Sequence, residues 1–414
     1  MGPLELKFNF RDIFRSPRIA LSGKKIFIFI QGNLLGFILY WIFSYLSLAL
    51  TGLSIQESIG KYGLYPCLFG NNAEWYSYLI YFIGIEAWIL AICFASTAVS
   101  RVSLKQMKGN DFYSSGEAWT YVFKHWHAVA FSPVALALII FFFIFSAALF
   151  GLISTIPYLG EFFFVVPYLL YFLGSIFTTY TLLVFIISFI YTPPIVGVYE
   201  EDTMGTIFQS YSITFGQNWR IIIYHILLLP LIALGLEIFS WFCFNAIGLI
   251  NYIFGCSWFM GEKLTNITNY ASSLVYPVWM TEMLYSIKDC VLDCFGLTYN
   301  IPYFFQPFSD TYNVIDITPT ESIAGVILAL FYFIIGLSII SYGFSILTVG
   351  ETLMFIIFKK ISDNDNLLLR KDEDEIDEEL NDDYDDDLGD ISESPDITKK
   401  TDEDSGNQNY SEEE

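Results

Sequence analysis

The sequence has few of the groups on which soluble enzymes and nucleic-acid-binding proteins depend. Its 414 residues include 3 histidines and 20 lysines and arginines, and charged residues make up 15% of the chain. It has no phosphate-binding glycine loop, no H-E-x-x-H pair, no nucleophile elbow and no cysteine cluster with zinc spacing. We therefore expect no catalytic residues, no metal and no cofactor. A nucleic-acid partner is not indicated either, because the basic residues lie beside apolar segments.

Long apolar runs are what the sequence has instead. Hydrophobic residues make up 55% of the chain. Six segments each reach the roughly 20 residues that a helix needs to cross a bilayer core. They predict an all-α fold, a bundle of six transmembrane helices. The segments are Ile26–Leu50, Tyr78–Val99, Val134–Ile153, Phe162–Tyr191, Ile221–Ile250 and Ile323–Leu347.

Basic residues alternate between the two sides of this predicted bundle. Assigning successive loops to opposite sides places 17 lysines and arginines on one side and 3 on the other. Cytoplasmic loops are the ones that retain Lys and Arg, so both termini are expected in the cytoplasm. The first apolar segment is too long for the h-region of a signal peptide, and we expect it to remain as an anchor.

The acidic charge is concentrated at the C-terminus. Residues 363–414 hold 23 acidic and 4 basic side chains, so this tail contributes −19 of the net charge of −23. With so few apolar residues it is expected to be disordered in the cytoplasm. It is either a solvated segment that the anionic leaflet repels or a docking segment for a basic partner. Residues 1–362 form the predicted membrane domain.

The cysteines divide by predicted location. Cys93 and Cys243 lie in membrane segments, whereas four others fall on the predicted outer side, where an oxidising compartment would allow disulfides. Their pairing is not determined by the sequence, and no His or further Cys accompanies them as a metal site would require. These four are Cys67, Cys256, Cys290 and Cys294.

A short amphipathic stretch precedes the first, third and fifth apolar segments. Two of them place aromatic and aliphatic residues at helical spacing on one face, and the first is interrupted by Pro17, where Ser16 would cap a new helix. We expect interfacial helices on the cytoplasmic side, and hence three repeats at about 10–99, 114–191 and 202–350. The two faces comprise Trp119, Val122, Phe123 and Trp126, and Met204, Ile207, Phe208, Tyr211 and Phe215.

Start signals accompany two of these stretches. Ser114 and Glu117 have the spacing of a capping box, and Asp202 is a good N-cap residue. On the outer side, residues 251–322 form the only sizeable predicted region outside the membrane besides the tail. A further helix at about 280–294 is expected there, lying on the bundle, and this region is a candidate docking surface for protein partners.

Two carboxylates inside apolar segments are the candidate functional residues. Glu86 has no intramembrane Lys or Arg partner, and beside it Ala87, Ala91 and Ala95 form a small-residue row that lets another helix approach. We therefore expect Glu86 to face protein. Glu237 lies at a comparable depth, so the two carboxylates could share a cavity. A lone charge in hydrocarbon costs several kcal/mol. Either the two carboxylates take part in ion or proton transport, or they are neutral, hydrogen-bonded to Tyr or Ser, and have a packing role only.

Several short motifs resemble a group of uncharacterised bacterial inner-membrane proteins of unknown function, found in planctomycete-like genomes. The motifs are, in chain order, Ser115-Gly-Glu-Ala-Trp, Ile156–Glu161, Tyr191-Thr-Pro-Pro, Tyr199-Glu-Glu-Asp-Thr and Gln209–Arg220. The resemblance covers about residues 100–370. It implies a multi-pass fold in the bacterial cytoplasmic membrane and carries no activity or functional residues.

These features favour a non-enzymatic scaffold or accessory subunit of a membrane complex. The bilayer is its first partner, and proteins would dock on region 251–322 and on the acidic tail. The alternative is a transporter or channel that uses Glu86 and Glu237. An intramembrane enzyme is disfavoured, because no set of nucleophile, base or metal ligands is visible.

Overall fold

The computed structural model describes residues 6–70, 73–276, 304, 317–372 and 375–376. Within these residues the secondary structure is helical and contains no strand, which confirms the all-α prediction. The contacts divide the chain at residue 369, and residues up to that point form one compact unit. All the helices named below belong to this unit.

Six helices are long and apolar enough to cross a membrane, which confirms the predicted number and makes the chain a multi-pass membrane protein. They are α2 (Gly23–Ala49), α4 (Trp75–Lys108), α6 (Trp126–Ile153), α8 (Tyr168–Pro194), α10 (Asn218–Phe254) and α13 (Pro319–Ser362).

Most of these helices extend beyond the apolar segments from which they were predicted. α4 and α13 continue for several turns past the predicted ends, because the residues there, polar ones on α4 and mostly apolar ones on α13, are still buried against other helices. The fourth segment was predicted to start too early. Phe162–Val165 belong to a separate short helix, α7 (Gly160–Val165), and α8 starts only after Pro167, a residue that favours the beginning of a helix.

The three amphipathic stretches are helical. η1 (Phe10–Arg15) and α1 (Ser16–Ala20) precede the α2/α4 hairpin, α5 (Ser115–Lys124) precedes α6/α8, and α9 (Thr203–Gly216) precedes α10/α13. The predicted capping box at Ser114 and Glu117 is present, and the Asp202 carboxylate accepts from the Gly205 amide. The predicted cap at Ser16 is displaced by one residue, because Arg15 occupies the N-cap position.

The predicted aromatic faces of α5 and α9 are each divided in the structure. Val122 and Ile207 are buried, whereas Phe123 and Phe208 are 61% and 66% exposed. Trp126 is the first residue of α6, so it does not share the α5 face. The two helices therefore pack one side against the protein and leave aromatic rings outside, as helices at a membrane interface do.

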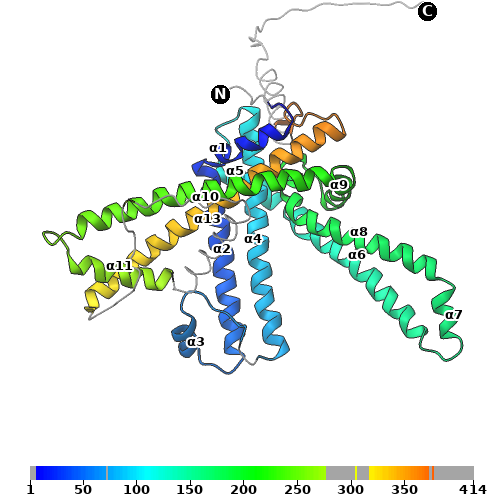
Figure 1. Ribbon diagram of the computed structural model, residues 1–414, viewed down its shortest axis with the longest axis horizontal. Helices are drawn as coiled ribbons and strands as arrows, with labels where there is room; N and C mark the ends of the chain where they lie inside the picture. Colours follow the sequence, from blue (N-terminus) through cyan, green and yellow to red (C-terminus); the bar gives the residue numbers. More distant parts are fainter. Residues whose placement is uncertain (1–5, 71–72, 277–303, 305–316, 373–374, 377–414) are drawn as a thin grey trace, which may run out of the picture. The chain divides into compact units, whose positions relative to one another are not determined.

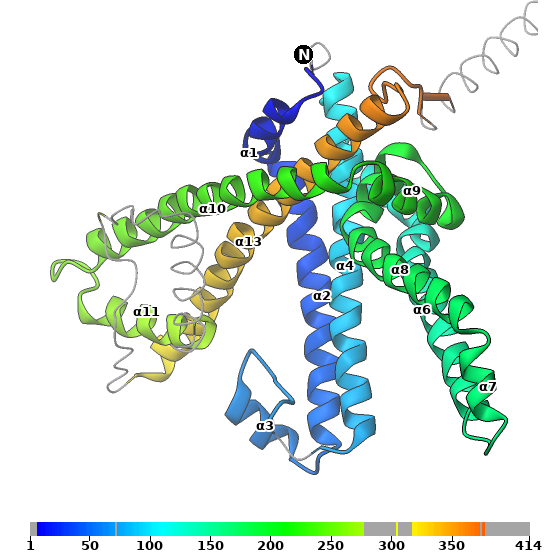
Figure 2. The same ribbon diagram turned by 45° about the vertical axis from the view of Figure 1, so that its right-hand side comes forward.

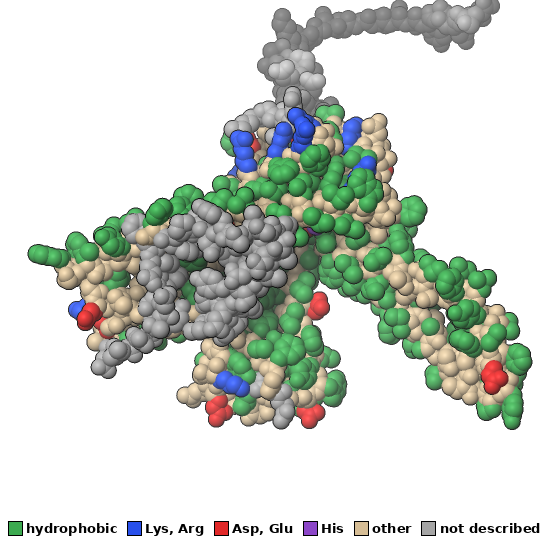
Figure 3. Space-filling view, viewed as in Figure 1, with side chains coloured by type: hydrophobic (Ala, Val, Ile, Leu, Met, Phe, Trp, Pro, Cys, Tyr) green, Lys and Arg blue, Asp and Glu red, His purple; other side chains and the backbone are tan. Residues whose placement is uncertain are grey.

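The three hairpins meet at one end, as Figures 1 and 2 show, and the same end carries α1, α5 and α9. We call this region the junction; it comprises residues 13–29, 95–129, 191–228 and 342–367. Lys and Arg side chains gather on the surface near α1 and α5, while hydrophobic side chains are abundant along the α6/α8 hairpin (Figure 3). The junction is thus the end at which basic side chains gather.

The last third of α13 is the centre of the junction. Residues from Ser345 to Phe358 are nearly all buried, on every side of the helix, and α13 packs against α1, α2, α4, α8 and α10. A helix that is apolar and buried all round is a core helix. The core extends past residue 362, because Leu367, within the predicted tail, is only 2% exposed.

The hairpins differ in what they contact away from the junction. The first and third hairpins touch, since the rings of Phe37 on α2 and Phe333 on α13 lie 5.3 Å apart. Tyr65 lies just after α3 (Ile55–Tyr62). Its hydroxyl donates a hydrogen bond of 2.8 Å to the carbonyl of Val275, the last residue of α11 (Glu262–Val275). The second hairpin, α6/α8, packs on α4 and α9 and diverges from the others (Figure 2).

Two predictions concern residues outside the described part of the chain. The helix expected at about 280–294 falls entirely within residues 277–303, and nearly all of the acidic tail falls within 377–414. Both stay predictions.

Candidate functional site

The junction contains a buried ion pair between helices that are far apart in the sequence. The Arg101 guanidinium of α4 is completely buried, and its Nη1 atom lies 2.6 Å from Oε1 of Glu200. The guanidinium also stacks 4.3 Å from the ring centre of Tyr121 on α5. The Tyr121 hydroxyl in turn donates to the Val196 carbonyl over 2.6 Å. The pair therefore ties α4, α5 and the segment after α8 into one polar network.

Glu200 reaches Arg101 through an unusual backbone. Pro193 and Pro194 end α8, and a π-helical turn, η2 (Ile195–Tyr199), follows. Glu200 then adopts the left-handed conformation with φ of 62°, which non-glycine residues rarely adopt. Residues held in such conformations need support from their surroundings. The ion pair with Arg101 supplies that support.

Gly197 allows this turn to approach α4. A Cβ atom added there would lie 2.8 Å from the Thr97 carbonyl oxygen and 2.9 Å from Ser100 Cβ, so only glycine fits. The approach brings the backbone of η2 onto the side of α4 that carries Arg101.

Glu351 is the second charged residue in the centre. It lies on α13, is 5% exposed, and is close enough to Cys93 on α4 and Tyr191 on α8 to interact electrostatically with both. Within the described part of the chain it forms no hydrogen bond or ion pair. Burying a carboxylate in this way is costly, and such groups inside membrane bundles are often functional.

Sequence reasoning missed Glu351, because the sixth apolar segment was ended at Leu347. The sequence nevertheless contained a signal for Glu351. The six residues Leu353–Phe358 are all apolar, so Glu351 lies within a longer apolar segment and not after the end of one.

Buried lysines complete the polar centre. Lys25 is fully buried at the start of α2, and its Nζ donates to the Ile19 carbonyl over 3.0 Å and to Gln106 Oε1 over 2.7 Å. Lys359 is 5% exposed, pairs with Asp363 over 2.7 Å and lies 4.4 Å from the Tyr199 ring centre. Carbonyl groups, carboxylates and ring faces thus replace the water that these ammonium groups lose.

The two carboxylates that the sequence singled out lie on different helices. Glu86 is exposed on α4, and Glu237 is half-buried on α10. α10 packs on α13, whereas α4 packs mainly on α2. α4 and α10 are thus not each other's main packing partners, and a cavity shared by Glu86 and Glu237 stays a prediction.

The small-residue row was correctly identified, and Glu86 lies beside it on a different face of α4. Ala91 and Ala95 are buried, and a Cβ added at Gly32 of α2 would lie 2.6 Å from Ala95 Cβ, so the two backbones approach closely. Glu86 precedes Ala87 by one residue, which turns it about 100° away around the helix. It therefore lies outside the α2 contact and is exposed in the single chain, and that it faces protein stays a prediction.

The cysteine predictions remain open. Cys256 is exposed just beyond the end of α10, and the Cys67 sulfur lies 3.9 Å from the Tyr81 hydroxyl. Cys67 and Cys256 form no disulfide with each other. Cys290 and Cys294 lie outside the described residues. Disulfides on this side of the protein stay a prediction.

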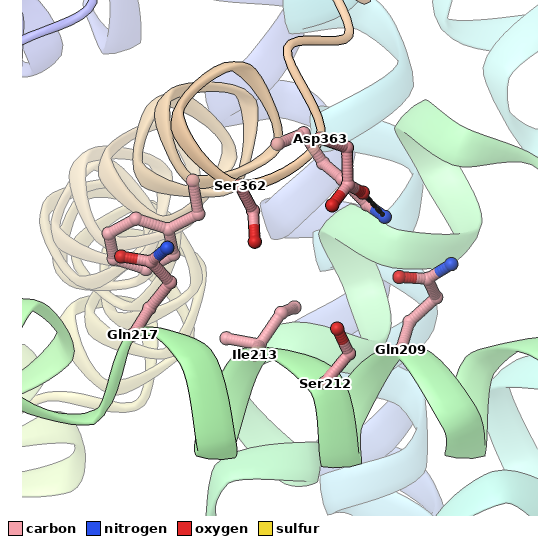
Figure 4. A pocket seen from close by; sticks show the side chains of 8 residues that line it. Gln209, Ser212, Ile213, Gln217, Ser362 and Asp363 are labelled. Atoms are coloured by element: carbon pink, nitrogen blue, oxygen red, sulfur yellow. Dashed lines mark hydrogen bonds and ion pairs between the residues drawn. The ribbon is translucent and has the colours of Figure 1, made fainter.

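A small surface cavity lies between α9 and the end of α13. Figure 4 shows it bordered by Gln209 and Ser212 of α9 on one side and Ser362 and Asp363 on the other. Its volume is about 10 Å³, room for about one water molecule. The cavity suits a water that bridges amide and hydroxyl groups, and it is too small for a substrate.

Comparison of the chain with models of known protein families, with curated proteins and with solved structures found no significant match.

Proposed function

We propose that this protein is a non-enzymatic scaffold or accessory subunit of a membrane complex. The supporting observation is that its centre is filled by its own side chains. Arg101, Tyr191 and Lys25 are the largest fully buried side chains, each less than 2% exposed, and all lie in the junction. The surfaces left for binding are on the outside of the hairpins and in the segments that connect them.

The second hairpin presents one such surface. Residues Leu138, Phe141 and Phe142 of α6 are 61%, 62% and 63% exposed, and α8 is similarly exposed along its length away from the junction. Extended apolar surfaces of this kind contact lipid or the apolar surface of a partner. Beyond α10, Trp258 and Phe259 are 93% and 69% exposed, and they support the region 251–322 as a docking surface.

We infer that the junction and both termini face the cytoplasm of a bacterial cell, with the protein in the inner membrane. The distribution of 17 basic residues against 3 supports this orientation. The resemblance to bacterial inner-membrane proteins supports the location, and its motifs include Tyr191, Pro193, Pro194 and Glu200, which lie in the junction.

The transport alternative gains no support from the arrangement of Glu86 and Glu237, since they lie on helices that are not each other's main packing partners. A flux measurement in proteoliposomes addresses it directly. Ion flux by the wild-type protein that Glu86→Gln abolishes would favour a transporter over a scaffold.

Co-purification from native membranes in a mild detergent tests the scaffold proposal. We expect the full chain to retain a defined protein at fixed stoichiometry. A chain ending at residue 376 tests the acidic tail, because it keeps the described residues intact; its control replaces residues 377–414 with a Gly/Ser segment of equal length. Loss of the partner from both variants would assign docking to the tail. If no protein co-purifies with the full chain, the scaffold proposal fails.

A further inference from the structure

One face of α4 is left uncovered where it passes through the membrane. Exposed apolar side chains repeat along it at helical spacing, and Glu86 lies among them. The apolar members are Leu79, Phe82, Ile83 and Ile89, which are 50%, 50%, 45% and 38% exposed. Two turns nearer the junction, the same face carries Cys93, which packs against Ala128 and Val129 of α6 and Val196 of η2. The face is thus covered until α6 diverges from α4, and uncovered beyond that point.

Glu86 lies deep in the membrane on this face. It is eleven residues along α4 from Trp75, about 16 Å at 1.5 Å per residue. A bilayer core is about 30 Å thick, so Glu86 is near its middle. A carboxylate facing lipid tails there costs several kcal/mol, and it forms no hydrogen bond or ion pair within the described part of the chain. An exposed carboxylate at this depth needs a donor from another molecule.

The long helices that the structure describes offer no cation at that depth. α6 and α8 contain no Lys or Arg, and every Lys, Arg and His of the six long helices lies in the junction. Away from the junction, the long helices of a second copy would bring only neutral groups or another carboxylate to Glu86, and a movement of α6/α8 onto α4 would bring only neutral groups. Charge complementarity therefore favours a different protein.

We propose that the Leu79–Ile89 face of α4 binds a transmembrane helix of a different protein, and that this helix carries a Lys, Arg or His that pairs with Glu86. The inference rests on the proposed function as a scaffold or accessory subunit, and it specifies the chemistry of the partner. The apolar residues on either side of Glu86 pack against the partner helix, and the ion pair fixes its depth and orientation, since intramembrane charges pair with one another.

Photo-crosslinking in native membranes tests this interface. The full chain carries p-benzoylphenylalanine in place of Phe82 or Ile89, each about one turn from Glu86. A chain with the same residue in place of Phe142, which is 63% exposed on α6, is the matched control. We expect both α4 positions to crosslink to the same transmembrane peptide of another protein, and that peptide to contain a Lys, Arg or His. The control position gives no crosslink to that peptide.

Charge variants then test the role of Glu86. Glu86→Lys reduces the crosslink yield at least about tenfold, since about 1.4 kcal/mol corresponds to a tenfold change in an equilibrium. Glu86→Gln gives an intermediate yield. Unchanged melting temperatures of both purified variants establish that they fold, as expected for an exposed side chain. Replacing the partner's basic residue with Glu restores crosslinking to Glu86→Lys.

Four results would overturn the inference: lipid adducts alone at both α4 positions, a crosslink to a second copy of this chain, a partner helix without a basic residue, or a yield that Glu86→Lys leaves unchanged. The scaffold proposal is judged separately. A partner that co-purifies in detergent without crosslinking at Phe82 or Ile89 leaves that proposal standing and removes only this interface.

Discussion

The Arg101 guanidinium and the Glu200 carboxylate lie 2.6 Å apart although 99 residues separate them in the sequence. The pair fixes the left-handed backbone at Glu200 on the one side and the buried end of α4 on the other. It thereby holds the second hairpin against the first within the junction. This makes the pair the most direct test of how the junction is assembled.

Replacing one partner of this pair should destabilise the protein strongly. Removing one side of a buried ion pair costs about 3–5 kcal/mol, because the other charge stays buried alone. We expect Arg101→Met to lower the free energy of unfolding in detergent by about 3 kcal/mol, since Glu200 keeps 15% exposure. The double variant with Glu200→Met should recover part of the loss. Arg18→Met, at an exposed arginine, is the control; equal effects at Arg18 and Arg101 would contradict the assignment.

Gly197, the glycine within η2, should be nearly irreplaceable. Gly197→Ala would place a Cβ 2.8 Å from the Thr97 carbonyl oxygen, and overpacking of this kind costs about 1–3 kcal/mol. The melting temperature in detergent measures the effect. Gly151→Ala on α6 is the matched control, since nothing lies within 4 Å of its added Cβ. The close approach of η2 to α4 is disproved if both variants melt at the same temperature.

Glu351 should tolerate the loss of its charge better than the loss of its volume. Glutamine has the same shape without the charge, and a buried carboxylate without a partner is costly. We expect Glu351→Gln to be at least as stable as the wild type in chemical unfolding, and Glu351→Ala to lose about 2 kcal/mol through the cavity it leaves. A Glu351→Gln variant as unstable as Glu351→Ala would show that the carboxylate makes a contact that the fold needs.

The stability of α3, a helix outside the membrane-spanning ones, should depend on pH through its capping box. Hydrogen bonds from the Ser54 side chain and backbone amide to Glu57 lower the pKa of that carboxyl. A lowered pKa in the folded state means that the cap stabilises α3 above the unfolded value of about 4.3 and that this contribution is lost as the pH falls through the folded pKa. Hydrogen exchange of the α3 amides measures it. Ser54→Ala should expose these amides at neutral pH and remove the extra loss of protection in acid; identical exchange in both proteins would rule out the cap.

Apolar run length was sufficient to predict the number of long helices, and Ser114, Glu117 and Asp202 were sufficient to predict where α5 and α9 begin. Both signals are local, since a bilayer demands a minimum length and a cap satisfies amides within one turn. Lys25 and Arg101 were counted as loop residues, which predicts the side of the membrane on which they lie. It does not predict their burial, because that depends on Gln106 and Glu200 elsewhere in the chain.

The candidate site was predicted less well, for a related reason. Glu86 was identified as an unpartnered intramembrane carboxylate, but the direction in which it points depends on which face of α4 packs against α2. That face contains Ala91 and Ala95, which are in register with Ala87 and not with Glu86. Glu351 was missed because a charged residue ended the apolar segment in the hydropathy pattern, whereas in the fold α13 is buried on all sides at that point. Tertiary packing decides both cases.

The orientation of the protein can be tested with single cysteines in a chain otherwise free of them. Cys256 is exposed beyond the end of α10, and Leu369, which is 82% exposed, lies beyond the end of α13 at the opposite end of the hairpin. If the junction faces the cytoplasm, an impermeant maleimide labels Cys256 in intact, reduced cells, whereas it labels Leu369→Cys only after lysis. Cys93, which is largely buried between α4 and α6, is the unlabelled control. The reverse pattern, with Leu369→Cys labelled in intact cells, would invert the topology and place the acidic tail outside, because α10 and α13 are joined as one hairpin.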